Sequence, residues 1–146
     1  MFSKGGGMMS CNNCCPDEGN GMAGIPILTD KFCGYFEVIC NNQANDDRFV
    51  WQSIQQLVTF PVAGTVTISY EGGCANNLTV NLRLGGKAGI IVGVLTIPDQ
   101  PGSNPNSQSI TVQQFDTLEI ICAGTGANTC IGEYCLNIHY PSPFNT

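Results

Sequence analysis

The sequence predicts an all-β domain, an antiparallel eight-stranded jelly-roll sandwich that follows a flexible N-terminal connector arm. From Ile27 onward, β-branched and aromatic residues alternate with polar residues at a period of two. Clusters of glycine, asparagine and proline interrupt this alternation at regular intervals. The segments between them show no helical periodicity. Strands of this length and spacing, with no helix between them, favour a sandwich or jelly roll.

The predicted strands cover most of the chain after the arm, and turn-forming residues separate them. For the second strand, a bend within it is the alternative, because the segment QSIQQL has a weak preference for β structure. The turns between strands are expected at 41–47, 72–76, 85–89, 98–107 and 124–128. The strands are expected near 27–40, 48–60, 64–71, 77–84, 89–97, 108–114, 116–123 and 130–140.

The composition changes near Pro26 and predicts two parts. Residues 1–26 are rich in glycine, methionine and cysteine and nearly lack β-branched residues, which is typical of a flexible connector. Residues 27–146 form the predicted sandwich domain. Three glycines in the connector would act as its hinge, since glycine adopts backbone conformations closed to other residues; they are Gly19, Gly21 and Gly24.

Charge and length exclude several classes of partner. The chain of 146 residues has a net charge of −6, with only 5 lysines and arginines. So few cations cannot make the phosphate contacts that drive nucleic-acid binding, nor hold the chain on anionic lipid. No stretch approaches the ~20 apolar residues of a membrane helix. We therefore expect neither a nucleic-acid nor a membrane partner.

Cysteine content and the N-terminus give conflicting indications of the compartment. The chain has 9 cysteines, a content typical of oxidising compartments. Its first residues, MFSKGGGMMSCNNCC, lack the apolar segment of a secretory signal. A protein made without a signal peptide and oxidised when its cell lyses would reconcile the two. A cytosolic metal protein is the alternative.

Side-chain alternation places two cysteines on outer faces. In the last strand, Cys135 shares a face with Asn137 and His139, opposite the apolar set Tyr134, Leu136, Ile138 and Tyr140. In the first strand, Cys33 lies beside Tyr35 and Glu37, because Phe32, Phe36 and Val38 occupy the core-facing positions. The same parity in residues 78–84 buries the leucines and exposes Asn81 and Arg83.

An odd number of cysteines leaves at least one thiol free or bonded to another chain. Cys122 and Cys130 flank a turn and are a candidate intramolecular disulfide. For Cys40 and Cys74 we expect a mutual bridge or burial.

The three arm cysteines allow different interpretations. Cys11 and Cys14 form half of a zinc site, but zinc needs four ligands and the second half is missing. We therefore expect no metal and no cofactor. Alternatively the arm is a tether, because the chain between Cys15 and Cys33 spans about 60 Å when extended. It could reach a neighbouring subunit or fold back onto its own domain.

Four motifs, in this order along the chain, resemble the endospore appendage (Ena) pilins, the family of spore-surface fibre subunits. They are the arm pair Cys14-Cys15, the segment DKFC ending at Cys33, VQQFDT at 112–117, and GEYC ending at Cys135. The resemblance spans nearly the whole chain. It departs from the family's simplest members in a longer arm with the extra Cys11 and in a proline-containing loop at 99–106.

The resemblance implies a structural role. The connector would reach into other subunits, where Cys14 and Cys15, with Cys11 as a further candidate, donate intermolecular disulfides to the acceptors Cys33 and Cys135. Subunits would self-assemble by β-strand augmentation into a spore-surface appendage, as a pilus-like fibre or as its ring, anchor or cap component. The implied partners are other copies of the chain and other spore-surface or appendage subunits. The implied location is the exosporium or coat, after synthesis in the mother cell.

Two other functions have less support in the sequence. His139 is the only histidine, and no serine occupies a nucleophile-elbow context, so we do not expect an enzyme. A small disulfide-stabilised jelly-roll binding module of the spore surface, for a carbohydrate or protein ligand, is the alternative function. Trp51, Tyr35 and Tyr134 would be its aromatic residues.

Overall fold

The computed structural model describes residues 26–55, 58–99, 105–126 and 128–141. Residues Thr29–Tyr140 form one compact unit. The expected connector, residues 1–26, lies almost wholly outside the described residues, so the boundary at 26/27 stays a prediction.

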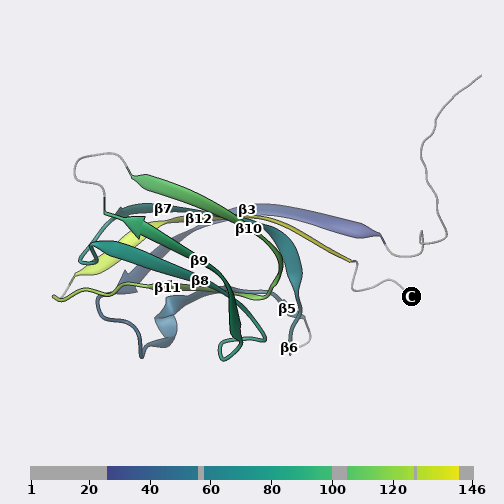
Figure 1. The fold of residues 1–146 in the computed structure, drawn as a ribbon, viewed down its shortest axis with the longest axis horizontal. Coiled ribbons are helices and arrows are strands. Elements are labelled where there is room, and N and C mark those ends of the chain that lie inside the picture. The colour runs from purple at the N-terminus through teal and green to yellow at the C-terminus, as the bar shows by residue number, and fades with distance from the viewer. Residues whose placement is uncertain (1–25, 56–57, 100–104, 127, 142–146) are drawn as a thin grey trace, which may run out of the picture. The chain divides into compact units, whose positions relative to one another are not determined.

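Two four-stranded antiparallel sheets make up the domain (Figure 1). The first sheet has the order β10 (Asn106–Phe115), β7 (Val62–Gly72), β12 (Thr129–Pro141), β3 (Ile27–Ile39). The second has the order β4 (Phe49–Gln52), β11 (Thr117–Ile121), β8 (Asn77–Leu84), β9 (Ile90–Pro98). The short pair β5 (Ile54–Gln55) and β6 (Val58–Thr59) and the 3₁₀ helix η2 (Asp46–Arg48) complete the described elements.

The strand order is that of a jelly roll. Counting the eight sheet strands along the chain, one sheet holds the first, eighth, third and sixth, and the other holds the second, seventh, fourth and fifth. Successive strands therefore alternate between the sheets or return as hairpins, as in a doubled Greek key. The predicted fold class is confirmed.

The second predicted strand contains the bend that the sequence left open. β4 ends at Gln52, and the chain then turns into the β5–β6 hairpin. The Ser53 N–H donates to the carbonyl of Asp116 at 2.9 Å, while the Phe60 N–H donates to the carbonyl of Ser53 at 3.0 Å. These bonds hold Ser53 at the corner. The other seven strands lie within a few residues of their predicted ranges.

The core lies between the two sheets and is built by alternation. β7 buries every second residue, in the pattern expected for a strand with one face in the core. Inward side chains of both sheets meet in one cluster, whose largest fully buried members are Tyr70, Phe115, Ile68, Leu78, Leu82, Ile97, Leu118 and Ile120. Each such side chain stabilises the fold by roughly 1.5–3 kcal/mol through burial.

The expected exposure of Asn81 and Arg83 is wrong. Asn81 is 6% exposed, and the Arg83 side chain is 21% exposed. Both point outward from β8 as parity requires, but the segment leading into β4 brings Arg48 onto the same face. The outer face of this sheet is therefore covered at β11, where Glu119 is 1% exposed.

Gly132 lies where two backbones approach closely. A Cβ atom at this position would lie 2.1 Å from the carbonyl oxygen of Ser69 and 2.5 Å from the Phe36 ring. We expect Gly132→Ala to lower the free energy of unfolding by about 2 kcal/mol, because β12 must move away from β7. Urea denaturation measures this change. Gly93→Ala is the control, since its Cβ would meet only side-chain atoms, the nearest at 3.0 Å, and no backbone. An equal loss in both variants would contradict the prediction.

Candidate functional site

A disulfide joins the first and last strands on the outer face of their sheet. Cys33 of β3 and Cys135 of β12 are bonded to each other, with their Cα atoms 4.0 Å apart. Cys33 is exposed and Cys135 is half-buried, in line with the outward faces that parity predicts. The disulfide therefore lies at the surface and not in the core.

This pairing differs from the expectation that both sulfurs await a partner chain. β3 and β12 are neighbours in the sheet, and the Cα atoms of the two cysteines lie 4.0 Å apart. Outward cysteines on adjacent strands can therefore pair within one chain, as these two do. The intermolecular role of Cys33 and Cys135 stays a prediction.

An open hollow of about 350 Å³ surrounds this disulfide. Lys31 of β3 and Thr67 of β7 contribute to its lining. Asn137, two residues beyond Cys135, also lines it. The Asn137 Oδ1 atom is buried and has no hydrogen-bond partner among the described residues. A buried hydrogen-bond acceptor without a donor destabilises the fold, and an N–H donor from an incoming chain would remove this destabilisation.

Paired hydroxyl groups continue this outer face toward β10. Thr65 and Thr111 lie 2.7 Å apart at their oxygens, as do Thr67 and Ser109, and Ser69 and Ser107 lie 2.6 Å apart. These cross-strand pairs carry no charge. The part of this face between β7 and β10 can therefore be covered without desolvating ions.

Apolar side chains are exposed on edge strands of both sheets. β9 exposes Ile90 (67%), Ile91 and Val94. β3 exposes Tyr35 (76%) and Ile39. Edge strands also present unpaired backbone groups, so such edges are suited to pairing with a strand of another chain.

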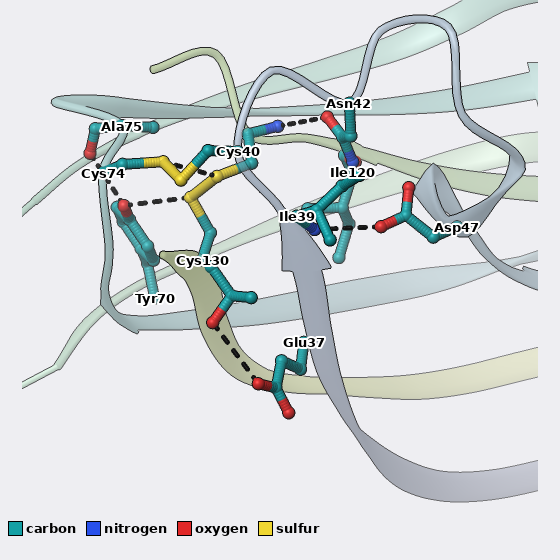
Figure 2. Close-up of a disulfide and its surroundings, with 12 residues drawn as sticks. Glu37, Ile39, Cys40, Asn42, Asp47, Tyr70, Cys74, Ala75, Ile120 and Cys130 are labelled. Atoms are coloured by element: carbon teal, nitrogen blue, oxygen red, sulfur yellow. Dashed lines mark hydrogen bonds between the residues drawn. A yellow bond between two sulfur atoms is a disulfide. The ribbon is translucent and has the colours of Figure 1, made fainter. Parts of the chain in front are cut away.

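Four cysteines form a compact sulfur cluster at one end of the domain (Figure 2). Cys40 is bonded to Cys74, and Cys122 is bonded to Cys130. The Sγ atoms of Cys74 and Cys122 lie only 3.3 Å apart, so the two disulfides touch. Both pairings are among those that the sequence allows, but residue spacing does not place the two disulfides side by side.

Glu119 is the centre of a charged network on the covered face of the second sheet. Its carboxylate accepts from the Arg48 Nε at 2.8 Å, the Arg83 Nε at 3.0 Å and the Asn81 amide at 2.9 Å. Burial alone would raise the pKa of Glu119, but the hydrogen bonds from Asn81, Arg48 and Arg83 outweigh it and lower that pKa below its usual range. Glu119 is therefore a structural anion that ties β11 to β8 and to the segment before β4.

Comparisons with known proteins identify the family. The sequence pattern of the family described as endospore appendages matches residues 12–142. The chain belongs to the endospore appendage family. None of the curated proteins compared with it matches. A solved chain described under "Bacillus endospore appendages form a novel family of disulfide-linked pili" is 23% identical, with a TM-score of 0.58. The match covers 88% of this chain and 96% of that one, and it supports the sandwich fold.

Several expected site residues of this appendage protein lie outside the described residues. They are the candidate donors Cys11, Cys14 and Cys15 and the hinge glycines Gly19, Gly21 and Gly24. Their roles stay predictions. Among the described residues, no helix is long and apolar enough to cross a membrane.

The only histidine of the appendage protein is exposed. The Nδ1 of His139 lies 2.9 Å from the hydroxyl of Thr29. In the part of the chain that the structure describes, no serine is hydrogen-bonded to it.

Three features of the structure could not be predicted from the sequence. They are the contact between the Cys40–Cys74 and Cys122–Cys130 disulfides, the hydrogen-bond network of Glu119, and the unpartnered Oδ1 atom of Asn137. Each depends on distances between strands that sequence spacing does not carry.

Proposed function

We propose that this protein is a structural subunit, not an enzyme, which self-assembles into a spore-surface appendage through strand augmentation and connector disulfides. The observation that carries the proposal is the Cys33–Cys135 pair, exposed on the outer face in an open hollow. Cys14 and Cys15, with Cys11 as a further candidate, would supply the attacking thiols from another copy. The partners would be other copies and other appendage or spore-surface subunits.

The hollow suits an extended connector segment. Its hydroxyl-lined side is uncharged, and the unpartnered Oδ1 of Asn137 would accept a backbone N–H of the incoming chain. Such a bond would hold an arm cysteine beside the exposed Cys33. Gly19, Gly21 and Gly24 would let the arm adjust its path while the link persists.

The first covalent link is a thiol–disulfide exchange. An arm thiolate attacks the Cys33 sulfur, forms the intersubunit bond and releases Cys135 as a thiolate. This step needs no oxidant. A second link, between Cys135 and the other arm thiol, removes two electrons, which oxidised glutathione or another small disulfide would accept. The two protons lost by the two arm thiols are taken up by the two small-molecule thiols that form.

Edge pairing would align the subunits before this chemistry occurs. Head-to-tail contacts between the exposed edges of β9 and β3 would propagate as a fibre or close as a ring. Edge pairing is reversible. Each intersubunit disulfide would stabilise the assembly by typically 2–4 kcal/mol, because it restricts the conformational freedom of the subunits when their edges separate. Synthesis in the mother cell, followed by oxidation at the spore surface, is consistent with this order.

Replacing Cys33 and Cys135 by serine tests the proposal. We expect wild-type protein, after oxidation, to give a ladder of covalent oligomers on non-reducing denaturing gels, which reductant collapses to the monomer. The double variant should fold and associate, but its assemblies should dissolve in denaturant without reductant. Electron microscopy of both proteins checks that fibres or rings form.

Cys40→Ser with Cys74→Ser is the matched control, since it also removes one internal disulfide but leaves the outer-face pair. It should keep the covalent ladder. A wild-type protein that runs only as a monomer after oxidation would overturn the proposal, as would a ladder that survives in the Cys33/Cys135 double variant.

A further inference from the structure

The sulfur cluster at the end of the sandwich has the composition of a metal site. We propose that Cys40, Cys74, Cys122 and Cys130, when reduced, bind one Zn²⁺ as a tetrathiolate centre, which oxidation converts into the two observed disulfides. The site is distinct from the Cys33–Cys135 pair. It also differs from the half-site that the sequence suggested at Cys11 and Cys14, because each of its four ligands comes from a different segment.

The distances between sulfurs suit one shared ion. The Sγ atoms of Cys40, Cys74 and Cys122 all lie within 4.8 Å of one another, and those of Cys74 and Cys122 lie 3.3 Å apart. Cys130 lies outside this group of three and, as the residue bonded to Cys122, would supply the fourth sulfur. Thiolates about 2.3 Å from a tetrahedral Zn²⁺ lie about 3.8 Å from each other. Three of the four sulfurs are already near this spacing, and the Cys130 side chain, released from Cys122 on reduction, would turn toward them to complete it.

The segments that carry these cysteines are held together without the disulfides. The Cys40 N–H donates to the Asn128 carbonyl at 3.2 Å, and the Asn41 N–H donates to the Cys122 carbonyl at 2.7 Å. The buried Asn42 side chain accepts from the Cys122 N–H at 2.8 Å and donates to the Ile120 carbonyl at 3.0 Å (Figure 2). Reduction of both disulfides therefore leaves the thiols close together.

Close backbone contacts fix the other side of the cluster. A Cβ atom on Gly73 would lie 2.6 Å from the Cys130 Cα, and one on Gly124 would lie 2.4 Å from the Cys74 carbonyl oxygen. The Tyr70 hydroxyl donates to the Ala75 carbonyl at 2.7 Å and contacts the Cys130 sulfur at 3.4 Å (Figure 2). The strand β7 thus supports the turn that carries Cys74.

Burial and ligand type favour zinc in a closed, structural site. Cys122 and Cys130 are fully buried, while Cys40 and Cys74 are partly buried against the core. Four soft thiolates with no oxygen ligand select zinc over magnesium or calcium. Binding releases the four thiol protons as the ion enters. No coordination position remains for substrate, so the ion would hold the end of the domain together before oxidation.

Oxidation of the loaded site balances with a peroxide as the oxidant. The four thiolates lose four electrons and form the Cys40–Cys74 and Cys122–Cys130 bonds, which releases Zn²⁺. Two hydrogen peroxide molecules accept these electrons and, with four protons, become four water molecules. A reduced cell interior would hold the zinc form, since thiols stay reduced there.

A variant that keeps only these four cysteines tests the proposal without touching the site. In the full chain, the other five are replaced by serine: Cys11, Cys14, Cys15, Cys33 and Cys135. After anaerobic reduction with a phosphine and its removal, Co²⁺ is titrated in as a spectroscopic probe. We expect one ion per chain, with thiolate-to-metal charge-transfer bands and the intense d–d absorption of a tetrahedral site. Zn²⁺ should displace it and bleach these bands.

Two further measurements complete the test. Adding Cys74→Ser to this variant should abolish the tetrathiolate spectrum, and hydrogen peroxide should release the bound zinc to a chromophoric chelator. Absence of thiolate–cobalt bands in the four-cysteine variant, folded or not, would overturn the proposal. So would unchanged binding after Cys74→Ser. The variant lacks every cysteine proposed for the fibre, so its result is independent of whether subunits link covalently.

Discussion

Phe115→Ala is expected to lower the free energy of unfolding by about 4 kcal/mol, the largest loss that we predict for a single substitution. Phe115 is fully buried at the end of β10, and its ring packs against Trp51 with the centroids 5.7 Å apart. The backbone that follows it is fixed, because the Asp116 N–H donates to the Arg83 carbonyl and the Asp116 carbonyl accepts from the Ser53 N–H. The cavity that Phe115→Ala leaves can therefore collapse only partly. The variant loses the free energy of burying the ring and also the packing contacts around the remaining cavity.

Urea denaturation followed by Trp51 fluorescence measures this loss. Tyr35→Ala is the control, since Tyr35 is also an aromatic residue on a strand but is 76% exposed. Its effect should stay within about 0.5 kcal/mol. A loss below about 1 kcal/mol for Phe115→Ala would show that this corner repacks, contrary to the prediction.

Glu119→Gln is expected to cost about 2–3 kcal/mol at pH 7. The neutral amide keeps the shape of the carboxylate but turns an N–H donor toward one of the groups that now donate to Glu119. Hydrogen bonds to a charged group contribute about 1.5–3 kcal/mol each. The expected loss is smaller than the sum over the three bonds, because the amide oxygen of glutamine still accepts hydrogen bonds and because the side chains of Arg48 and Arg83 are about one-fifth exposed and can be partly rehydrated.

The same substitution should change how stability depends on pH. Because the pKa of Glu119 is lowered by folding, its contribution is fully present above the pKa of the unfolded chain, about 4.3. The contribution is lost as the pH falls through the lower, folded pKa. The difference between wild type and Glu119→Gln should therefore shrink between pH 7 and pH 3. Glu133→Gln, at an exposed position, is the control, and a gap that widens in acid would contradict the assignment.

Strand positions and the jelly-roll class could be predicted because alternation with a period of two survives in the sequence. β7 and β12 show it clearly, and glycine or proline clusters mark the turns between strands. The same alternation placed Cys33 and Cys135 on an outer face. Each of these inferences depends only on residues that are neighbours along one strand.

The rest could not be predicted because it depends on which strands meet. Parity assigned Arg83 to the outer face correctly, but it cannot indicate that Arg48 crosses that face and buries Glu119. Likewise, Cys74 and Cys122 are 48 positions apart, and only the strand order brings their sulfurs into contact. Pairing of Cys33 with Cys135 required the knowledge that β3 and β12 are adjacent.

The bond between Cys33 and Cys135 has a mechanical consequence. It joins positions 102 residues apart and so closes nearly the whole sandwich into a covalent ring between its first and last strands. Tension applied at the two ends of the domain would run through this one sulfur bridge. While the bridge is intact, the strands between the two cysteines carry none of the pull and cannot be unravelled by it.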